Sequence, residues 1–389
     1  MTWIPSREKF DDSQIQIMND ILDDSEYSWW LQGYAGTGKT MLLIHLIAEY
    51  IDANWDCAFV TFTHALKKLA IEAMKDLGHD PDNLNIETVD KLNVFRRKYD
   101  IVFVDEIQDL TNTQIEKLLE LGDRFVYAGD VSQSIYLQAS SSTSIKRILG
   151  RPKIVELTDL YRMPEPIFLA ANIIYPEAEI KRAAQVRLTD DASINLAAAD
   201  SVAEEVEWVY KKAVKESRSK SPSAILFAGH EDLKKFVKIL VAQMNLPIAP
   251  EIIGKNYDPL NEYFRKNKVK IMFFGGAQGG DLSDASSSKI VLLMTMHSAK
   301  GLEFESVFVP SMNRGSSLCP YPSMKHNADW QRRFFFMAIT RTKRNFYASY
   351  SETLNEYLVP LTPENIFDTL RESNQQHKAK FFNHFHVRS

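Results

Sequence analysis

The stretch Gly33-Tyr34-Ala35-Gly36-Thr37-Gly38-Lys39-Thr40 decides the fold, because it fits the pattern G-x-x-x-x-G-K-[ST] with no mismatch. It follows the apolar run 29–31 and precedes residues 41–47, which are typical of a buried helix. A strand, a glycine loop and a helix in this order direct backbone N–H groups and a positive helix end toward a phosphate. Lys39 can then reach the β- and γ-phosphates of ATP, and Thr40 can offer its hydroxyl to Mg²⁺. A plain glycine turn before a core helix is the alternative, and Lys39-Thr40 argues against it.

The length and composition of the chain indicate its number of domains and exclude several classes of protein. The chain has 389 residues, which is longer than a single hydrophobic core usually supports, so we expect two domains. With 45% hydrophobic and 25% charged residues it is typical of a globular protein, and a net charge of −5 excludes a uniformly basic surface but not a local basic groove. The two cysteines, Cys57 and Cys319, exclude a disulfide framework and a cysteine-based zinc site. No apolar stretch has membrane-spanning length and the start lacks signal-peptide features, so we expect a cytoplasmic protein without a membrane partner.

The first part of the chain alternates expected strands with expected helices. Strands are predicted at 57–63, 101–104 and 124–128, with helices at 64–77 and 113–121 between and after them. This alternation predicts an α/β fold with a mainly parallel sheet. We place a domain boundary at 150–152, which gives domains 1–150 and 151–389.

The second part continues the same alternation. Helices are expected around 202–213, 233–244 and 332–341, and strands at 224–227, 289–296 and 345–350. The glycine- and serine-rich segment 275–288 is interpreted as the tip of a long hairpin. The tail from residue 373 is polar and basic, and we expect it to be loosely held.

Two carboxylates supply the partners that a phosphate loop needs. Asp105 and Glu106 directly follow the apolar run 101–104, as expected at the C-terminal end of a central parallel strand. Asp105 would hold Mg²⁺, and Glu106 would orient or deprotonate the attacking water. An exposed acidic turn is the alternative, and it fits poorly with a buried strand running into the pair.

An ordered set of motifs resembles the superfamily 1 DNA helicases of the UvrD/Rep/PcrA type. The resemblance implies two RecA-like P-loop NTPase domains with ATP in the cleft between them, and single-stranded DNA running across both. It implies an ATP-dependent translocase or helicase with 3′→5′ movement. The set comprises Gln14, GYAGTGKT (33–40), VTFTHALKKLA (60–70), VDEIQD (104–109), YAGDVSQSIY (127–136), LTDLYRMP (157–164), TMHSAKGLEF (295–304) and FFFMAITRTKRNFY (334–347).

Three further nucleotide contacts follow from the resemblance. Gln14 resembles the glutamine that reads the adenine edge, and Tyr161 the tyrosine that stacks on the adenine. Glu303 resembles the glutamate near the ribose and the phosphates. A polar helix residue is the alternative for Gln14, and a core residue the alternative for Tyr161.

Three catalytic groups are implied in the same way. Gln133 resembles the sensor of the γ-phosphate between ATP and DNA. Arg162 and Arg341 resemble the arginines that contact the γ-phosphate from the second domain, with Arg341 as the arginine finger. Such an arrangement makes hydrolysis depend on closure of the two domains. Surface ion pairing is the alternative for both arginines.

Candidate DNA contacts lie in both halves of the chain. Aromatic faces can stack bases without reading sequence, while lysines and hydroxyls can hold phosphates. A lone histidine is more often structural, and only the surrounding motif favours His297 as a contact. The candidates are Phe62, Thr63, His64, Thr88, Tyr136, Thr295, His297, Ser298 and Lys300.

Departures from the family pattern qualify its implied activity. Leu137-Gln138 stands where an aromatic base-stacking residue is expected. The short spacings 62–105 and 254–289 leave no room for the family's two large accessory domains, which predicts a compact motor core.

The expected lack of accessory domains bears on the partners and on the alternative functions that we consider. The expected partners are single-stranded DNA or a duplex with a 3′ single-stranded tail, together with a nuclease or other accessory protein. An ATP-switched DNA-binding sensor, or a motor subunit of a repair or antiviral nuclease complex without autonomous unwinding, is the main alternative. RNA is a third possibility, and a small-molecule kinase would not account for residues 295–304.

Overall fold

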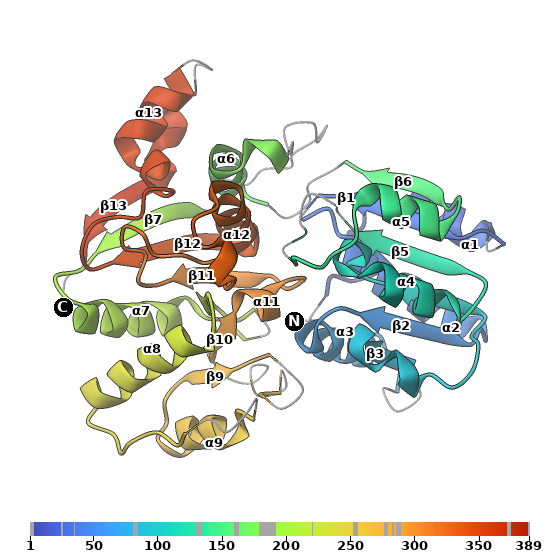
Figure 1. Ribbon diagram of the computed structural model, residues 1–389, viewed down its shortest axis with the longest axis horizontal. Helices are drawn as coiled ribbons and strands as arrows, with labels where there is room; N and C mark the ends of the chain where they lie inside the picture. Colours follow the sequence, from blue (N-terminus) through green and yellow to red (C-terminus); the bar gives the residue numbers. More distant parts are fainter. Residues whose placement is uncertain are drawn as a thin grey trace. The chain divides into compact units, whose positions relative to one another are not determined.

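The chain folds into two compact units, each with its own sheet and its own core (Figure 1). One unit holds the described residues up to 158, and the other holds those from 163 onward. No helix in this described part of the chain is both long and apolar enough to cross a membrane. The computed structural model describes residues 4–24, 26–34, 36–80, 85–129, 134, 136–158, 163–178, 192–219, 221–251, 256–275, 279–281, 284, 289–371 and 375–387, with only the backbone at 142 and 377.

The first unit is built on a six-stranded sheet in which every pair of neighbouring strands is parallel. The strand order is β3-β2-β4-β5-β1-β6, so β1, which leads into the phosphate loop, is an inner strand. The elements are α1 (Asp12–Asp23), β1 (Trp29–Gly33), α2 (Lys39–Asp52), β2 (Cys57–Thr61), α3 (His64–Asp76), β3 (Asn85–Thr88), β4 (Ile101–Val104), α4 (Asn112–Leu119), β5 (Phe125–Gly129), α5 (Ser142–Leu149) and β6 (Lys153–Leu157).

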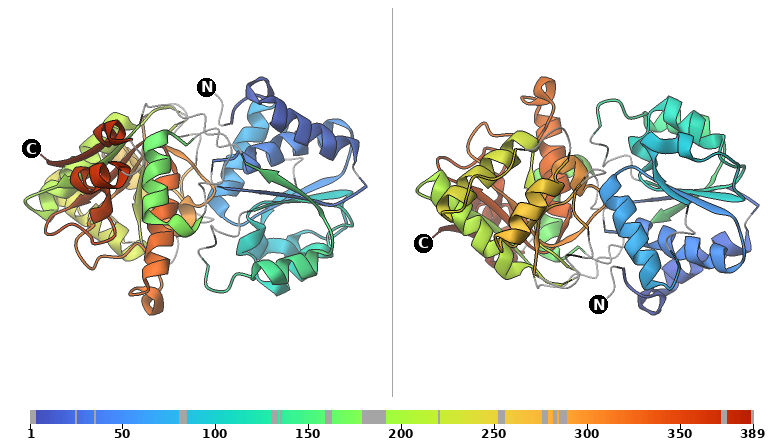
Figure 2. Two further views of the ribbon diagram at one scale, coloured as in Figure 1. Left: turned by 90° about the horizontal axis from the view of Figure 1, so that it is seen from above. Right: turned by 90° about the horizontal axis from the view of Figure 1, so that it is seen from below.

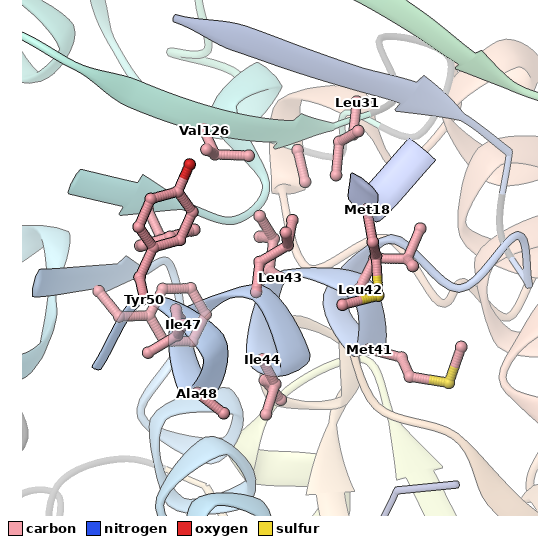
Figure 3. Packing of buried hydrophobic residues seen from close by; sticks show 14 of the residues in the cluster. Met18, Leu31, Met41, Leu42, Leu43, Ile44, Ile47, Ala48, Tyr50 and Val126 are labelled. Carbon is pink, nitrogen blue, oxygen red and sulfur yellow. The ribbon is translucent and has the colours of Figure 1, made fainter. Parts of the chain in front are cut away.

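Helices cover both faces of this sheet because the strands bury side chains on both. Leu31 and Val126 point to the face covered by α1, α2 and α3, where Leu43 and Met18 pack against them (Figure 3). Trp30, the residue before Leu31, belongs instead to the core beneath α4 and α5. The alternation places two apolar layers around one sheet, as in a doubly wound α/β domain.

The first unit extends beyond the predicted boundary at 150–152. β6 follows that point in the chain and pairs in parallel with β1, from Trp29 opposite Lys153 to Gly33 opposite Leu157. The helix α5 also begins within a polar serine-rich tract, where the Ser141 hydroxyl accepts a hydrogen bond from the Ser144 backbone N–H at 3.2 Å. The sheet that carries the phosphate loop is therefore completed by residues placed in the second domain on sequence grounds.

The second unit has a seven-stranded sheet that is also parallel throughout. Its strand order is β13-β7-β12-β11-β8-β10-β9. α7, α8 and α9 build a core with the sheet, and α6 packs against α12 (Figure 2). The elements are α6 (Glu165–Ile174), β7 (Ser193–Ala198), α7 (Val202–Glu216), β8 (Ala224–Phe227), α8 (His230–Gln243), α9 (Asp258–Lys266), β9 (Ile271–Phe273), β10 (Val291–Thr295), α11 (Met296–Ala299), β11 (Phe304–Val309), α12 (Ala328–Thr340), β12 (Thr342–Tyr350), α13 (Pro363–Arg371) and β13 (Phe382–His386).

Two expectations for the second unit are wrong. The strands on either side of the glycine- and serine-rich segment, β9 and β10, pair in parallel, with Leu292 opposite Met272, and so do not form a hairpin. The tail also contributes a strand, since β13 pairs in parallel with β7 and buries Phe382.

Short connections stand at the two places where the resemblance to UvrD/Rep/PcrA-type helicases implies accessory domains. Between α3 and β4 the described residues contain β3 and a 3₁₀ helix, Val89–Val94. Between α8 and β10 they contain α9 and β9. Both units are therefore compact at these positions within the described chain.

Candidate functional site

The phosphate loop joins the end of β1 to the start of α2. Gly36 and Gly38 have φ angles of 82° and 84°, a left-handed region that a side chain disfavours. A Cβ at Gly33 would lie 2.7 Å from the Leu157 carbonyl oxygen, so this position also requires glycine. The Lys39 Nζ donates to the Gly33 and Tyr34 carbonyl oxygens at 2.6 and 2.8 Å, and so lies against the loop it is predicted to serve.

Thr40 and Asp105 meet although 65 residues separate them. The Thr40 hydroxyl donates to Asp105 Oδ2 at 2.5 Å, and the Glu106 backbone N–H donates to Oδ1 at 2.9 Å. Burial, and then the charge of Glu106, raise the pKa of Asp105, while the Thr40 hydrogen bond and the charge of Lys39 oppose that shift. A hydroxyl and a buried carboxylate in contact are oxygen ligands suited to Mg²⁺, whose charge would favour the ionised carboxylate.

Glu106 adopts a backbone conformation that is unusual for a residue with a side chain. Its φ and ψ are 56° and 43°, in the left-handed region. The Gln108 Nε2 donates to Glu106 Oε2, and Gln108 is itself buried against Gly129, where any Cβ would collide with the Gln108 amide oxygen. The sequence analysis assigned no role to Gln108. Its position two residues after Glu106 could have indicated a side chain that contacts the Glu106 carboxylate.

Gln14 lies beside the phosphate loop. Asp11 caps α1 by accepting from the Gln14 backbone N–H at 2.9 Å, which fixes this residue in the first turn. The side chain is 2% exposed, and its Nε2 has no hydrogen-bond partner among the described residues. A Cβ on Gly38 would lie 3.0 Å from that nitrogen. A buried donor left without a partner next to the loop fits the base of a bound nucleotide.

Some nucleotide-site residues predicted from the sequence are not described by the structure, whereas others lie together at one edge of the first sheet. Ala35, Gln133, Tyr161 and Arg162 lie outside the described residues. The structure brings Thr40, Asp105, Glu106 and Lys39 together at the carboxyl ends of β1 and β4, where ligands bind in open parallel sheets.

The predicted DNA contacts of the first unit gather at the ends of β2 and β3. The rings of Phe62 and Tyr136 lie 4.4 Å apart between centroids. The Thr63 hydroxyl caps α3 by accepting from the Leu66 N–H at 3.1 Å, and the Thr88 side chain is buried. Burial, with Lys91 and Lys67 next, lowers the pKa of His64, which keeps this side chain neutral at pH 7. Phe62 and Tyr136 are thus the residues of this set that offer partly exposed aromatic rings.

The predicted contacts of the second unit follow β10. Thr295 caps α11, accepting from the Ser298 N–H at 3.4 Å, and its hydroxyl lies 3.0 Å from the Ser298 hydroxyl. His297 Nε2 is 2.8 Å from the Tyr321 hydroxyl, and burial with the charge of Lys300 lowers the pKa of His297 to about 4. Lys300 is buried. The histidine is therefore neutral at pH 7 and offers no positive charge to a phosphate.

Arg341 ends α12 and is 5% exposed. Its guanidinium donates to the Met337 and Leu302 carbonyl oxygens at 3.3 and 3.5 Å, and to the Thr340 hydroxyl at 3.3 Å. Glu303 follows Leu302 directly, just before β11, so the two predicted residues lie close together in this unit. These carbonyl and hydroxyl oxygens help to orient the Arg341 guanidinium.

A protein-family model decides the family. The model described as AAA domain matches residues 9–205, just over half of the chain and including the phosphate loop. The chain belongs to the AAA domain family. A second model, the UvrD-like helicase C-terminal domain, matches residues 278–353, which include Thr295, Lys300 and Arg341.

Individual relatives of this AAA domain protein are helicases by name. A probable DNA helicase of Mycoplasma pneumoniae is 28% identical over 308 residues, covering 75% of this chain and 51% of the relative. The ATP-dependent DNA helicase Rep of Buchnera aphidicola is 32% identical over 105 residues, covering 25% of this chain and 15% of Rep. The chain spans about half the length of the first and less of the second. The arterivirus nonstructural protein 10 helicase aligns over 85% of this chain and 61% of its own, with 16% identity and a TM-score of 0.42.

Proposed function

We propose that this protein hydrolyses ATP and uses the energy to move along single-stranded DNA in the 3′→5′ direction. The observation that carries the proposal is the contact between Thr40 and Asp105 beside Lys39, with the unsatisfied amide of Gln14 next to the same loop. These groups come from α1, α2 and β4 and share no other evident purpose. The two sequence relatives described above are DNA helicases by name, which supports the choice of DNA.

Each residue of the first unit has a defined task in this proposal. Lys39 binds the β- and γ-phosphates, while Thr40 and Asp105 hold Mg²⁺. The metal neutralises charge on the phosphates when it is bound. Glu106 orients the attacking water and takes its proton, and Gln108 keeps the Glu106 carboxylate in place.

The second unit contributes positive charge in this proposal. Arg341 approaches the γ-phosphate, joined by Arg162, with Gln133 sensing the phosphate, Tyr161 on the adenine and Glu303 near the ribose. The planar guanidinium of Arg341 is suited to the charge of the transferring phosphoryl group. Hydrolysis then requires the two units to close on the nucleotide, which couples chemistry to movement.

The test is DNA-stimulated ATP hydrolysis by Lys39→Ala. We expect turnover to vanish with oligo-dT present, because the variant loses the cation that meets the β- and γ-phosphates. Lys98→Ala is the matched control, since Lys98 is an exposed lysine of the same unit, paired with Asp123 at 3.0 Å. Undiminished turnover in Lys39→Ala would contradict the proposal that this protein hydrolyses ATP at the phosphate loop.

An ATP-switched sensor or a non-unwinding subunit of a nuclease complex is the second candidate. It is favoured by Leu137, which is 42% exposed at the position where the resemblance to UvrD/Rep/PcrA-type helicases implies an aromatic base-stacking residue. Displacement of streptavidin from 3′- and 5′-biotinylated single strands separates the two. A translocase clears one end only and so reveals its polarity, whereas a sensor clears neither.

A further inference from the structure

Four ring-bearing side chains form a cluster in the second unit beside the motif that follows β10. His297 lies 5.4 Å from Tyr321 and 6.2 Å from Phe334, measured between ring centroids. Tyr321 lies 5.7 Å from Trp330 with the ring planes at 88°, and Trp330 lies 6.3 Å from Phe334. The cluster thus joins the loop before α12, the first two turns of α12 and the segment 295–300.

The surrounding hydrogen bonds hold the two outer rings in position. Asn327 caps α12 by accepting from the Trp330 backbone N–H at 3.2 Å. The buried amide of Gln331 donates to the Ser317 hydroxyl and to the Lys325 carbonyl oxygen, both at 2.6 Å. These bonds tie the loop that carries Tyr321 to the helix that carries Trp330. The rings are therefore held in a fixed arrangement, which reduces the entropy cost of binding.

Burial differs across the cluster, so that part of its aromatic surface is accessible. Phe334 is fully buried and forms the floor, whereas Tyr321 and Trp330 are half-buried. The neighbouring His297 is neutral at pH 7 because burial lowers its pKa to about 4, and its Nε2 is engaged by the Tyr321 hydroxyl. The four-residue cluster thus offers aromatic surface to a ligand, whereas His297 contributes no positive charge.

We propose that Tyr321 and Trp330 are a base-stacking site for single-stranded DNA in the second unit. The inference rests on the proposed function and on the candidate DNA contacts predicted at residues 295–300. Partly exposed aromatic rings bind bases of any sequence through their π faces. The site would supply stacking that the first unit lacks at Leu137, where an exposed aliphatic side chain replaces an aromatic ring.

The experiment measures the Kd of a fluorescein-labelled dT oligomer by anisotropy for Trp330→Leu and Tyr321→Leu. We expect about a tenfold loss of affinity in each, as for removal of one stacked base. Trp208→Leu is the control, because Trp208 is another half-buried tryptophan of this unit, which packs on Tyr347 and Phe385. Affinity equal to the wild type in both variants, with the wild type binding, overturns the stacking site and leaves the proposed function intact. No binding by the wild type overturns the proposed function itself.

Two further measurements separate stacking from a structural role. An oligomer of the same length with abasic sites should bind the wild type more weakly than dT, and this difference should shrink about tenfold in Trp330→Leu. A difference of unchanged size would show that Trp330 acts through the fold, and would overturn the proposal. Tyr321→Phe keeps the ring and should retain affinity within about threefold. A loss as large as in Tyr321→Leu would assign the effect to the hydroxyl and overturn stacking by this ring.

Discussion

Glu106 shows how the site is prepared at the scale of single residues. A non-glycine residue in the left-handed region costs about 1–3 kcal/mol, a cost that other interactions must offset. Here the backbone N–H of Glu106 binds Asp105 and its carboxylate accepts from Gln108. The strain is thus tied to bonds that fix both carboxylates before any ligand arrives.

Replacing Gln108 tests this preparation. In Gln108→Leu the Glu106 carboxylate loses its hydrogen-bond donor, so we expect kcat for ATP hydrolysis to fall about 10- to 100-fold. The Kd of ATP should change little, because Lys39 and Thr40 remain in place. Steady-state kinetics with saturating DNA measure both, with the exposed Gln16→Leu as control. A raised Kd with unchanged kcat would contradict the positioning role.

Arg341 gives a second test at this scale. Arg341→Ala should cut turnover about 10³-fold or more while ATP still binds, because an arginine finger acts on the transition state. Arg341→Lys should recover only part of the rate, since an ammonium group cannot reproduce the planar guanidinium. Full activity in the alanine variant would remove Arg341 from the proposed mechanism.

The lowered pKa of His297 predicts that the free energy of unfolding depends on pH. Its pKa is about 4 in the folded chain, against 6.5 for an unperturbed histidine, so the unfolded chain binds the proton first as the pH falls. Stability is therefore lost as the pH falls below 6.5, and the loss is complete below about 4, where it reaches roughly 3 kcal/mol. Urea denaturation from pH 7 to pH 4.5 should show a smaller fall for His297→Gln than for the exposed control His326→Gln. Parallel curves would contradict this.

At the scale of elements, local signals were sufficient for most of the α/β pattern. Asp11 caps α1 by accepting from the Gln14 backbone N–H, as expected of an aspartate just before a helix. The apolar run 101–104 is β4 and delivers Asp105 and Glu106 to its end as predicted, although their roles remain predictions. Choice of strand partner is not local, which explains the wrong hairpin before β10, the unforeseen β13, and β6 beyond the expected boundary. Tyr321 and Trp330 were missed for the same reason, since only the fold brings Tyr321 beside His297 and Trp330 beside Tyr321.

The strand β13 can be tested through its two phenylalanines. Phe382 is 3% exposed and Phe385 is 36% exposed. Phe382→Ala should lower the free energy of unfolding by about 3 kcal/mol through cavity formation, and Phe385→Ala by much less. Chemical denaturation compares them, and equal small losses would show that β13 adds little to the second unit.

At the scale of the whole molecule, each sheet has its own core, so stability should respond unit by unit. Leu43 is fully buried in the first unit and Phe264 in the second. We expect Leu43→Ala and Phe264→Ala to lower different calorimetric transitions, each by the equivalent of about 3 kcal/mol. Identical shifts of a single transition would show that the units unfold together.

The order of strands in the second sheet bears on how the protein is made. β7 lies between β12 and β13, and pairs with no strand that precedes it in the chain among the described elements. At a translation rate of about 5–20 residues per second, β7 leaves the ribosome on the order of ten seconds before β12 is synthesised. During that time Ile194 and Leu196, which end up fully buried, have no strand to cover them. The nascent second unit therefore passes through an aggregation-prone interval in which a chaperone such as a ribosome-associated holdase would have its largest effect.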